Sequence, residues 1–247
     1  MAMDIKKDLL INGTAYVLAT IGTCVATATG SHTLEFVCKP MLMIILSSWF
    51  FFNSRRYGDR FTILVQVGLF FSLVGDVAMM FQYKDEFNFL IGLGAFLIAQ
   101  LCFVMAFMRN IIDVGGLEGW LLGGSLSIVV ALYAILFSWQ LMQHVEEGLS
   151  SPVTAYVVAI ALMGITAALR HGRTFPRSFW MVFVGALLFI GSDSLLAINR
   201  FVKPLAWGPL TVIIVYAAAQ FLITAGCLLH VLDPETILRK KALEDIS

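Results

Sequence analysis

Charged side chains are scarce in this chain. Only 13% of its 247 residues are Asp, Glu, Lys or Arg, whereas soluble domains carry roughly 25%. Hydrophobic residues make up 60% of the sequence, and the mean hydropathy is +0.89. A chain this short has no soluble core large enough to bury so much apolar surface, which leaves lipid as the solvent. The composition therefore excludes a soluble globular domain and indicates an integral membrane protein.

The sequence also lacks an excess of charge and a recognisable set of metal ligands. Its 16 basic residues balance 16 acidic ones, so nucleic acid is not an expected partner. The cysteines lie scattered in apolar runs, as small packed hydrophobes do: Cys24, Cys38, Cys102 and Cys227. The histidines fall at loops or helix ends: His32, His144, His171 and His230. No phosphate-binding loop, nucleophile elbow or HExxH motif occurs. We expect no metal site and no cofactor.

Apolar stretches long enough to cross a bilayer, which requires roughly 20 residues, fill most of the chain. They lie near residues 9–28, 36–53, 61–81, 88–108, 118–139, 152–169, 179–199 and 209–231. The first follows a start of mixed charge with no clear cleavage site, so we interpret it as a membrane helix; a signal peptide is the alternative. The sequence predicts an all-α, polytopic transmembrane helical bundle of about eight spans, with residues 1–247 forming a single domain.

The basic residues of the connections predict the orientation, because cytoplasmic loops are enriched in Lys and Arg. Twelve fall on the side of the N-terminus: Lys6, Lys7, Arg55, Arg56, Arg60, Arg109, Arg170, Arg173, Arg177, Arg239, Lys240 and Lys241. Three fall on the other side: Lys84, Arg200 and Lys203. We expect both termini in the cytoplasm. Trp49 and Trp207 suit interfacial anchors.

Three ionisable residues lie inside apolar runs, where insertion of Asp or Lys costs about 2.5–3.5 kcal/mol. They are Lys39, Asp76 and Asp193. At 1.5 Å per residue they lie ~5, ~8 and ~10 Å from the outer ends of their spans. Taken by itself, Lys39 could extend its side chain to the lipid headgroups. A purely structural Asp–Lys ion pair is an alternative to a functional site. One lysine does not neutralise two aspartates, however, so the two carboxyl groups suggest a shared site.

Further polar side chains fall in the same layer of the membrane. They are Gln100, Tyr156, Ser192, Ser194, Tyr216 and Gln220. The tyrosines are also typical of an interfacial belt, and the serines and glutamines of interhelical hydrogen bonds. Together with the three ionisable residues they predict a polar pocket in the outer half of the bundle.

Two close carboxyl groups in a poorly solvated site do not both ionise cheaply, so the pair offers one proton donor and one anion. This arrangement suits general acid catalysis through a cationic transition state. It equally suits proton coupling in a transporter, or water activation in an intramembrane aspartyl protease. The protease signature GxGD is absent, since the sequence reads Leu73-Val74-Gly75-Asp76.

Short motifs follow one another in a specific order over roughly residues 36–225. They are Lys39-Pro40, Gly75-Asp76, the stretch from Gly185 to Ser194, and Gly92, Phe96, Tyr156, Met163, Ala167, Ala197, Phe201, Tyr216 and Gln220. Together they resemble the YhhN-type lysoplasmalogenase family. Where span four of that family often carries a His followed by a Tyr, this chain has Gln100 and Phe103. A role for that histidine therefore does not transfer.

The resemblance implies hydrolysis of the vinyl-ether bond of a lysoplasmalogen, a lysophospholipid of the membrane, to a fatty aldehyde and a glycerophospho-base. We hypothesise that one of Asp76 and Asp193 donates the proton while the other stabilises the cation and orients water. Lys39 would pair with an Asp or bind the phosphate, and Tyr156, Ser192, Ser194, Tyr216 and Gln220 would contact water or substrate. A proton-coupled transporter or lipid-binding protein is the alternative. The compact loops favour a multi-pass protein of a bacterial inner membrane.

Overall fold

The computed structural model describes residues 2–55, 58–82, 85–114 and 119–233, in which helices occur but no strand. The helices are α1 (Ala2–Thr29), α2 (His32–Ser54), α3 (Arg60–Met80), α4 (Glu86–Val114), α5 (Trp120–Met142), α6 (Glu147–Leu169), α7 (Pro176–Ala197), the π-helical turn η2 (Ile198–Val202) and α8 (Gly208–Leu232). Eight of them are long and apolar enough to cross a membrane. The all-α transmembrane bundle predicted from the sequence is confirmed. That residues 1–247 form one domain stays a prediction.

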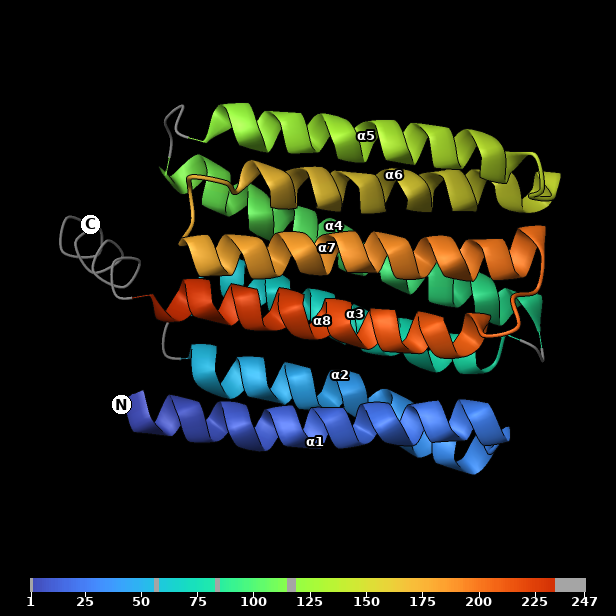
Figure 1. Ribbon diagram of the computed structural model, residues 1–247, viewed down its shortest axis with the longest axis horizontal. Coiled ribbons are helices and arrows are strands. Elements are labelled where there is room, and N and C mark those ends of the chain that lie inside the picture. The colour runs from blue at the N-terminus through green and yellow to red at the C-terminus, as the bar shows by residue number, and fades with distance from the viewer. Residues whose placement is uncertain (1, 56–57, 83–84, 115–118, 234–247) are drawn as a thin grey trace.

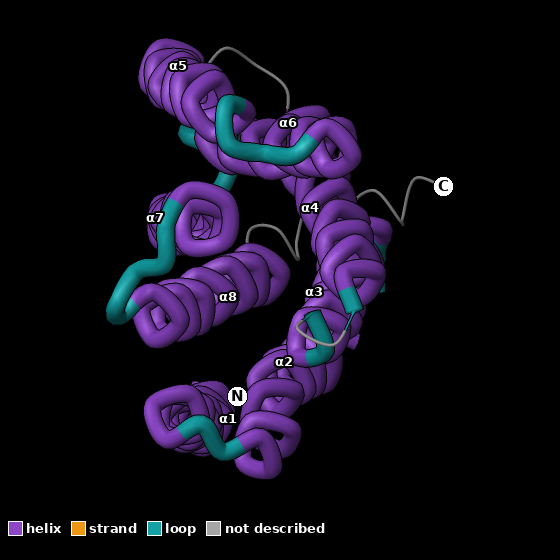
Figure 2. The backbone as a smooth tube through the Cα atoms, turned by 90° about the vertical axis from the view of Figure 1, so that its right-hand side faces the viewer, coloured by secondary structure: helices purple, strands orange, loops and turns teal. Residues whose placement is uncertain are grey.

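The helices run side by side along one common direction (Figure 1). Seen end on, α1, α2, α3, α4, α6 and α5 form a curved wall, and the antiparallel pair α7 and α8 lies on its concave side (Figure 2). Helix α8 contacts α1, α2 and α3, and α7 contacts α6. Side chains of α7 and α8 therefore face the interior of the wall, where a site can be shielded from lipid.

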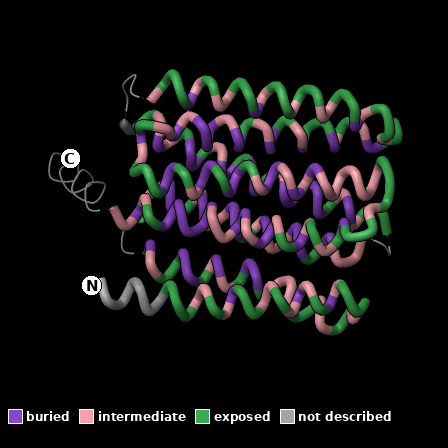
Figure 3. The backbone as a smooth tube through the Cα atoms, in the orientation of Figure 1, coloured by how far each residue is buried: buried purple, intermediate pink, exposed green. Residues whose placement is uncertain are grey.

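Burial follows this arrangement closely (Figure 3). Helices α4, α6 and α8 carry much of the buried surface, while α1 and α5 expose most of their apolar side chains. In water these exposed helices would be unfavourable, but in a bilayer lipid tails solvate them as well as other side chains do. The core is rich in aromatic side chains, with Phe103, Phe107, Phe179 and Phe189 fully or almost fully buried.

Local sequence signals set where several helices begin and turn. Asp59 and Thr62 form a reciprocal capping box at the start of α3, which satisfies backbone N–H groups that the first turn leaves free. Pro176 occupies the first turn of α7, where its fixed φ suits a helix and its missing N–H is not needed. Gly30 and Gly172 turn the chain with φ of +68° and +74°, a region that glycine enters without steric strain.

Two expectations differ from the structure. Helix α2 begins at His32 rather than near residue 36, so Lys39 lies about seven residues, or ~10 Å, from its start. The helix continues through Pro40 because neighbouring groups can satisfy the backbone that proline frees inside a membrane protein. Trp49 is not an interfacial anchor, since it is buried and stacks on Phe221 at 5.9 Å. Trp207 is exposed.

The described ends of the chain, Ala2 and Leu232, lie at the same end of the bundle (Figure 1). We call the opposite end the distal end. Some of the basic residues counted for orientation lie outside the described residues: Arg56, Lys84, Arg239, Lys240, Lys241 and the side chains of Lys6 and Lys7. The expected start of the fifth span, residue 118, also lies outside them. The common position of the two ends agrees with an even number of spans.

Helices α7 and α8 approach each other most closely where glycine replaces a side chain. A Cβ atom on Gly185 would lie 2.9 Å from the backbone nitrogen of Ile223 and 3.0 Å from the carbonyl oxygen of Ala219. Gly226 lies equally close to Val182, because its Cβ would lie 2.7 Å from that side chain. Small residues at such crossings let helices pack by van der Waals contact in lipid, where no hydrophobic force drives them together.

This packing predicts that Gly185→Ala destabilises the bundle. The added methyl group meets backbone atoms that move only if α7 and α8 separate, and such overpacking costs about 1–3 kcal/mol. Thermal unfolding of the purified protein in detergent measures the effect as a lower melting temperature. Gly191→Ala in the same helix is the control, because its Cβ would meet no atom within 4 Å. Equal melting temperatures for the two variants would contradict the assigned packing.

Candidate functional site

Asp193 lies near the distal end of α7 and is bound by a tyrosine from the neighbouring helix. The hydroxyl of Tyr156 on α6 donates a hydrogen bond to its carboxylate. Tyr156 is 9% exposed and is therefore not a residue of an interfacial belt. Its hydrogen bond fixes the Asp193 carboxyl and joins α6 to α7 at this level of the membrane.

An apolar pocket opens beside this pair, between α4, α5, α6 and α7. Its empty volume is about 810 Å³, its open mouth included. The few polar side chains in its wall are Tyr133, Tyr156, Asp193, Ser194 and Arg200. The rest of the lining is apolar and includes Phe96, Phe137 and Ile160. A long apolar ligand would place one point of its chain against the Asp193 carboxyl.

Asp76 lies inside the bundle, near the distal end of α3, and is only 3% exposed. The hydroxyl of Tyr216 on α8 donates to its carboxylate at 2.8 Å. Gln220, one turn along α8, donates to the hydroxyls of Ser72 at 3.1 Å and of Tyr216 at 3.3 Å. A chain of polar groups thus joins α3 to α8.

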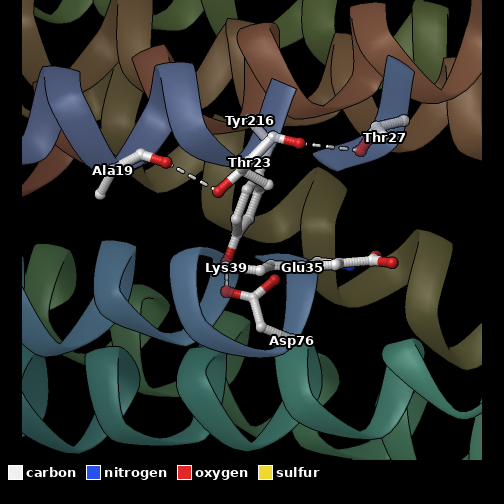
Figure 4. Close-up of polar contacts among 7 residues, drawn as sticks. All are labelled: Ala19, Thr23, Thr27, Glu35, Lys39, Asp76 and Tyr216. Carbon is white, nitrogen blue, oxygen red and sulfur yellow. Dashed lines mark hydrogen bonds and ion pairs between the residues drawn. The ribbon is translucent and has the colours of Figure 1, made fainter. Parts of the chain in front are cut away.

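Lys39 approaches this second carboxyl from α2. It interacts electrostatically with Asp76 and forms an ion pair at 4.0 Å with Glu35, one turn earlier in the same helix. In Figure 4, Tyr216 points from α8 onto Asp76, and Lys39 and Glu35 lie alongside. Lys39 is partly buried and does not line the pocket beside Asp193. The structure therefore places it next to Asp76, away from the wall of that pocket.

A cluster of aromatic rings packs beside the two carboxyl groups: Tyr216 binds Asp76, and Phe96 lines the pocket next to Asp193. Phe96, Phe189 and Tyr216 meet edge to face with centroid distances of 5.5–6.4 Å. Gly75 lets the Phe96 ring come this close, since a Cβ there would lie 2.7 Å from it. Asp76 and Asp193 still interact electrostatically. The structure thus brings both carboxyl groups to one level, but each has its own tyrosine and only Asp193 lines the pocket.

Of the remaining polar residues of the predicted layer, Gln100 and Ser194 belong to the site beside Asp193, whereas Ser192 joins two helices. Gln100 is fully buried and faces Tyr156, so it belongs to the site. The Ser194 hydroxyl accepts a hydrogen bond from Tyr133 at 2.8 Å and donates to the carbonyl of Ile190. The Ser192 hydroxyl donates to the backbone carbonyl of Val212 at 3.1 Å. Ser192 therefore joins α7 to α8 and does not line the pocket.

Several residues of the site escaped the sequence analysis. Tyr133 and Arg200 line the pocket, and Ser72 completes the hydrogen bonds around Gln220. Arg200 was counted only as a loop charge, although η2 carries it as a continuation of α7. Its spacing of seven residues from Asp193, two helical turns, was the available signal, because such residues share a helix face.

The described residues contain no group of three His, Cys, Asp or Glu side chains arranged to hold a metal ion. Hydrogen bonds to the two carboxylates come from tyrosine hydroxyls. The arrangement can present a fixed carboxyl to an apolar ligand, with a second carboxyl nearby to favour positive charge.

Comparison of the sequence with known proteins identifies the family of this chain. The YhhN family profile matches residues 34–227. A protein of Mycobacterium bovis named lysoplasmalogenase is 34% identical over 145 residues, which cover 56% of this chain and 50% of the relative. The chain thus matches about half the length of that relative.

Vertebrate relatives are matched over a larger share of their length. The protein named lysoplasmalogenase TMEM86B is 30% identical in Rattus norvegicus, over 192 residues that cover 77% of this chain and 71% of the relative. In Homo sapiens it is 30% identical over 191 residues, which cover 77% and 73%. No solved structure matches the chain. The profile match covers both carboxyl groups and most of the chain, which therefore belongs to the YhhN family.

Proposed function

We propose that this protein is a lysoplasmalogenase. It hydrolyses the vinyl-ether bond of a 1-alkenyl lysophospholipid and releases a fatty aldehyde and glycerophosphoethanolamine or glycerophosphocholine. Relatives from bacteria and vertebrates bear the name of this activity. The observation that carries the proposal is the single carboxyl of Asp193, fixed by Tyr156, in the wall of a mostly apolar pocket.

Hydrolysis of a vinyl ether begins with a proton on carbon. The acid protonates the alkenyl carbon that is not bonded to oxygen, which leaves an oxocarbenium ion at the adjacent carbon. Water adds to that carbon and loses a proton, and the hemiacetal collapses to the aldehyde and the free glycerol hydroxyl. We assign the donated proton to Asp193, because Asp193 lines the pocket where the chain would lie. Its carboxylate then accepts a proton from the attacking water.

Asp76 contributes without lining the pocket. Its carboxyl interacts electrostatically with Asp193, and a negative charge there would stabilise the oxocarbenium ion across a medium of low polarity. Tyr216 and Gln220 hold Asp76 in place. Gln100 faces Tyr156 from behind the pocket wall and would help to hold the tyrosine hydroxyl in place. Lys39 limits the excess of negative charge around Asp76.

We further propose that the protein lies in a bacterial inner membrane and that both termini face the cytoplasm. The described ends of the chain share one end of the bundle (Figure 1). Arg55, Arg60, Arg109 and Arg170 lie at or near helix ends on that same side, which agrees with the enrichment of basic residues in cytoplasmic loops. The site then lies in the half of the membrane that faces away from the cytoplasm.

The proposal predicts that Asp193→Asn abolishes aldehyde release from 1-alkenyl lysophosphatidylethanolamine. The amide has the size of the carboxyl but does not donate the catalytic proton, and acid catalysis contributes ~10²–10⁴-fold to such rates. Asp76→Asn should lower kcat as well, because it removes the negative charge nearest the cation. Aldehyde formation by the purified protein in detergent is the measurement.

Asp113→Asn serves as the matched control, since Asp113 is an exposed carboxyl near the end of α4. It should retain wild-type activity. Melting temperatures of all variants separate loss of chemistry from loss of fold. Near-normal turnover in both Asp193→Asn and Asp76→Asn would refute the carboxyl assignment, and proton flux without any aldehyde would point to a transporter instead.

A second prediction separates the two tyrosines that line the pocket. Tyr156→Phe removes the hydrogen bond to Asp193, and kcat should fall roughly tenfold or more, given the value of hydrogen bonds to charged groups. Tyr133→Phe removes a hydrogen bond between two neutral hydroxyls, from Tyr133 to Ser194, which touches no proposed proton donor, and kcat should change little. Equal losses in the two variants would show that the hydroxyls act only through packing.

A further inference from the structure

Arg200 is the only basic side chain among the residues that line the pocket beside Asp193. It lies in η2, the five-residue π-helical turn that continues α7 to Val202. The backbone N–H of Lys203 donates to the carbonyl of Ile198 at 2.9 Å, which closes this turn. Such π turns within helices often occur at functional sites. Arg200 thus lies at the distal end of a pocket that is otherwise almost entirely apolar.

The Arg200 guanidinium is fixed in position by an aromatic ring. Its central carbon lies 3.7 Å from the centroid of the Phe89 ring, and Phe89 also lines the pocket. An arginine stacked on an aromatic face keeps its N–H donors free at the edge of the guanidinium plane. The side chain is 23% exposed, so an entering ligand can reach it.

The protein itself neutralises this guanidinium weakly. Its nearest carboxylate among the described residues is Glu86, at 3.8 Å, and the Glu86 side chain is 61% exposed. Gln82 accepts one long hydrogen bond at 3.4 Å. Exposed ion pairs of this kind contribute little, and an arginine carries five N–H donors. Most of the hydrogen-bonding capacity of Arg200 therefore stays available for an anion.

Arg200 and Asp193 lie on one face of the same helix. Ile190, Asp193, Ala197 and Arg200 all line the pocket, at the three- and four-residue spacing of a helical stripe. Seven residues separate the carboxyl from the guanidinium along the chain, or ~10 Å along the axis. In a lysophospholipid, about seven bonds join the protonated alkenyl carbon to the phosphorus, and at ~1.5 Å per bond they span somewhat less than ~10 Å. The two side chains thus match the two ends of one substrate.

We propose that Arg200 binds the phosphate of the lysophospholipid headgroup and so sets the alkenyl bond against Asp193. This inference rests on the proposed function for the identity of the substrate. The phosphate displaces the weak contact with Glu86 and accepts two parallel N–H bonds from the guanidinium. The apolar chain then runs into the pocket between α5 and α6. Arg200 is a specificity-determining residue here, whereas Lys39, turned toward Asp76 and Glu35, does not contact the headgroup.

Direct binding tests this assignment without turnover. The purified full-length chain in detergent is titrated with a 1-alkyl lysophosphatidylethanolamine, which has no vinyl ether, and with the phosphate-free 1-alkylglycerol of equal chain length. Arg200→Met should weaken binding of the phospholipid by roughly tenfold or more, as loss of a charge-assisted contact does. Binding of the alkylglycerol should stay unchanged, and Arg200→Lys should restore part of the phospholipid affinity.

Lys203→Met is the matched control, because Lys203 is a nearby exposed cation that does not line the pocket. It should leave both affinities unchanged. Unchanged phospholipid binding in Arg200→Met would overturn the assignment. An equal loss for both ligands would also overturn it, since that result indicates a structural role. If the wild type binds the phospholipid through Arg200 but releases no aldehyde from any alkenyl lipid, the headgroup site stands and the proposed hydrolysis fails.

Discussion

Two carboxyl groups lie inside a bundle that lipid surrounds, and each depends on a tyrosine from another helix. A buried carboxyl without a hydrogen-bond donor would be strongly unfavourable in such surroundings. Tyr156 supplies the donor to Asp193 from α6, and Tyr216 supplies it to Asp76 from α8. These bonds fix the height of α6 relative to α7 and the height of α3 relative to α8. The pocket beside Asp193 depends on the first of them, because Tyr156 and Asp193 both line it.

Glycine residues make this arrangement sterically possible. The hydrogen bond from Tyr216 to Asp76 requires α8 to lie close to α3, and the Phe96 ring fills the space above Gly75 that a side chain would otherwise occupy. Gly185 and Gly226 bring α7 and α8 into backbone contact. Glycines therefore serve two purposes in this bundle: Gly185 and Gly226 pack two helices in lipid, and Gly75 leaves room for an aromatic ring beside Asp76.

Much of this site could be predicted from the sequence because a charge in an apolar run is conspicuous. Asp76 and Asp193 stand out for that reason, and counting residues from the span ends places them at one depth. Tyr156, Tyr216 and Gln220 were found by the same depth argument. Contacts that depend on the rotation of each helix were not predictable. Ser192 therefore turned out to face the Val212 carbonyl, and Trp49 to be buried.

The position of Arg200 in the pocket could not be predicted from the sequence either. A cation beyond the apparent end of a span is normally a loop residue, and only the continuation of α7 through η2 turns it onto the face of Asp193. A π turn accommodates one residue more than an α turn, and each residue of an α-helix rotates the following side chains by ~100°. Deleting one residue between Ala197 and Arg200 would therefore preserve a helix while swinging the arginine out of line with the carboxyl. In this segment the number of residues, rather than their identity, aligns the two ends of the site.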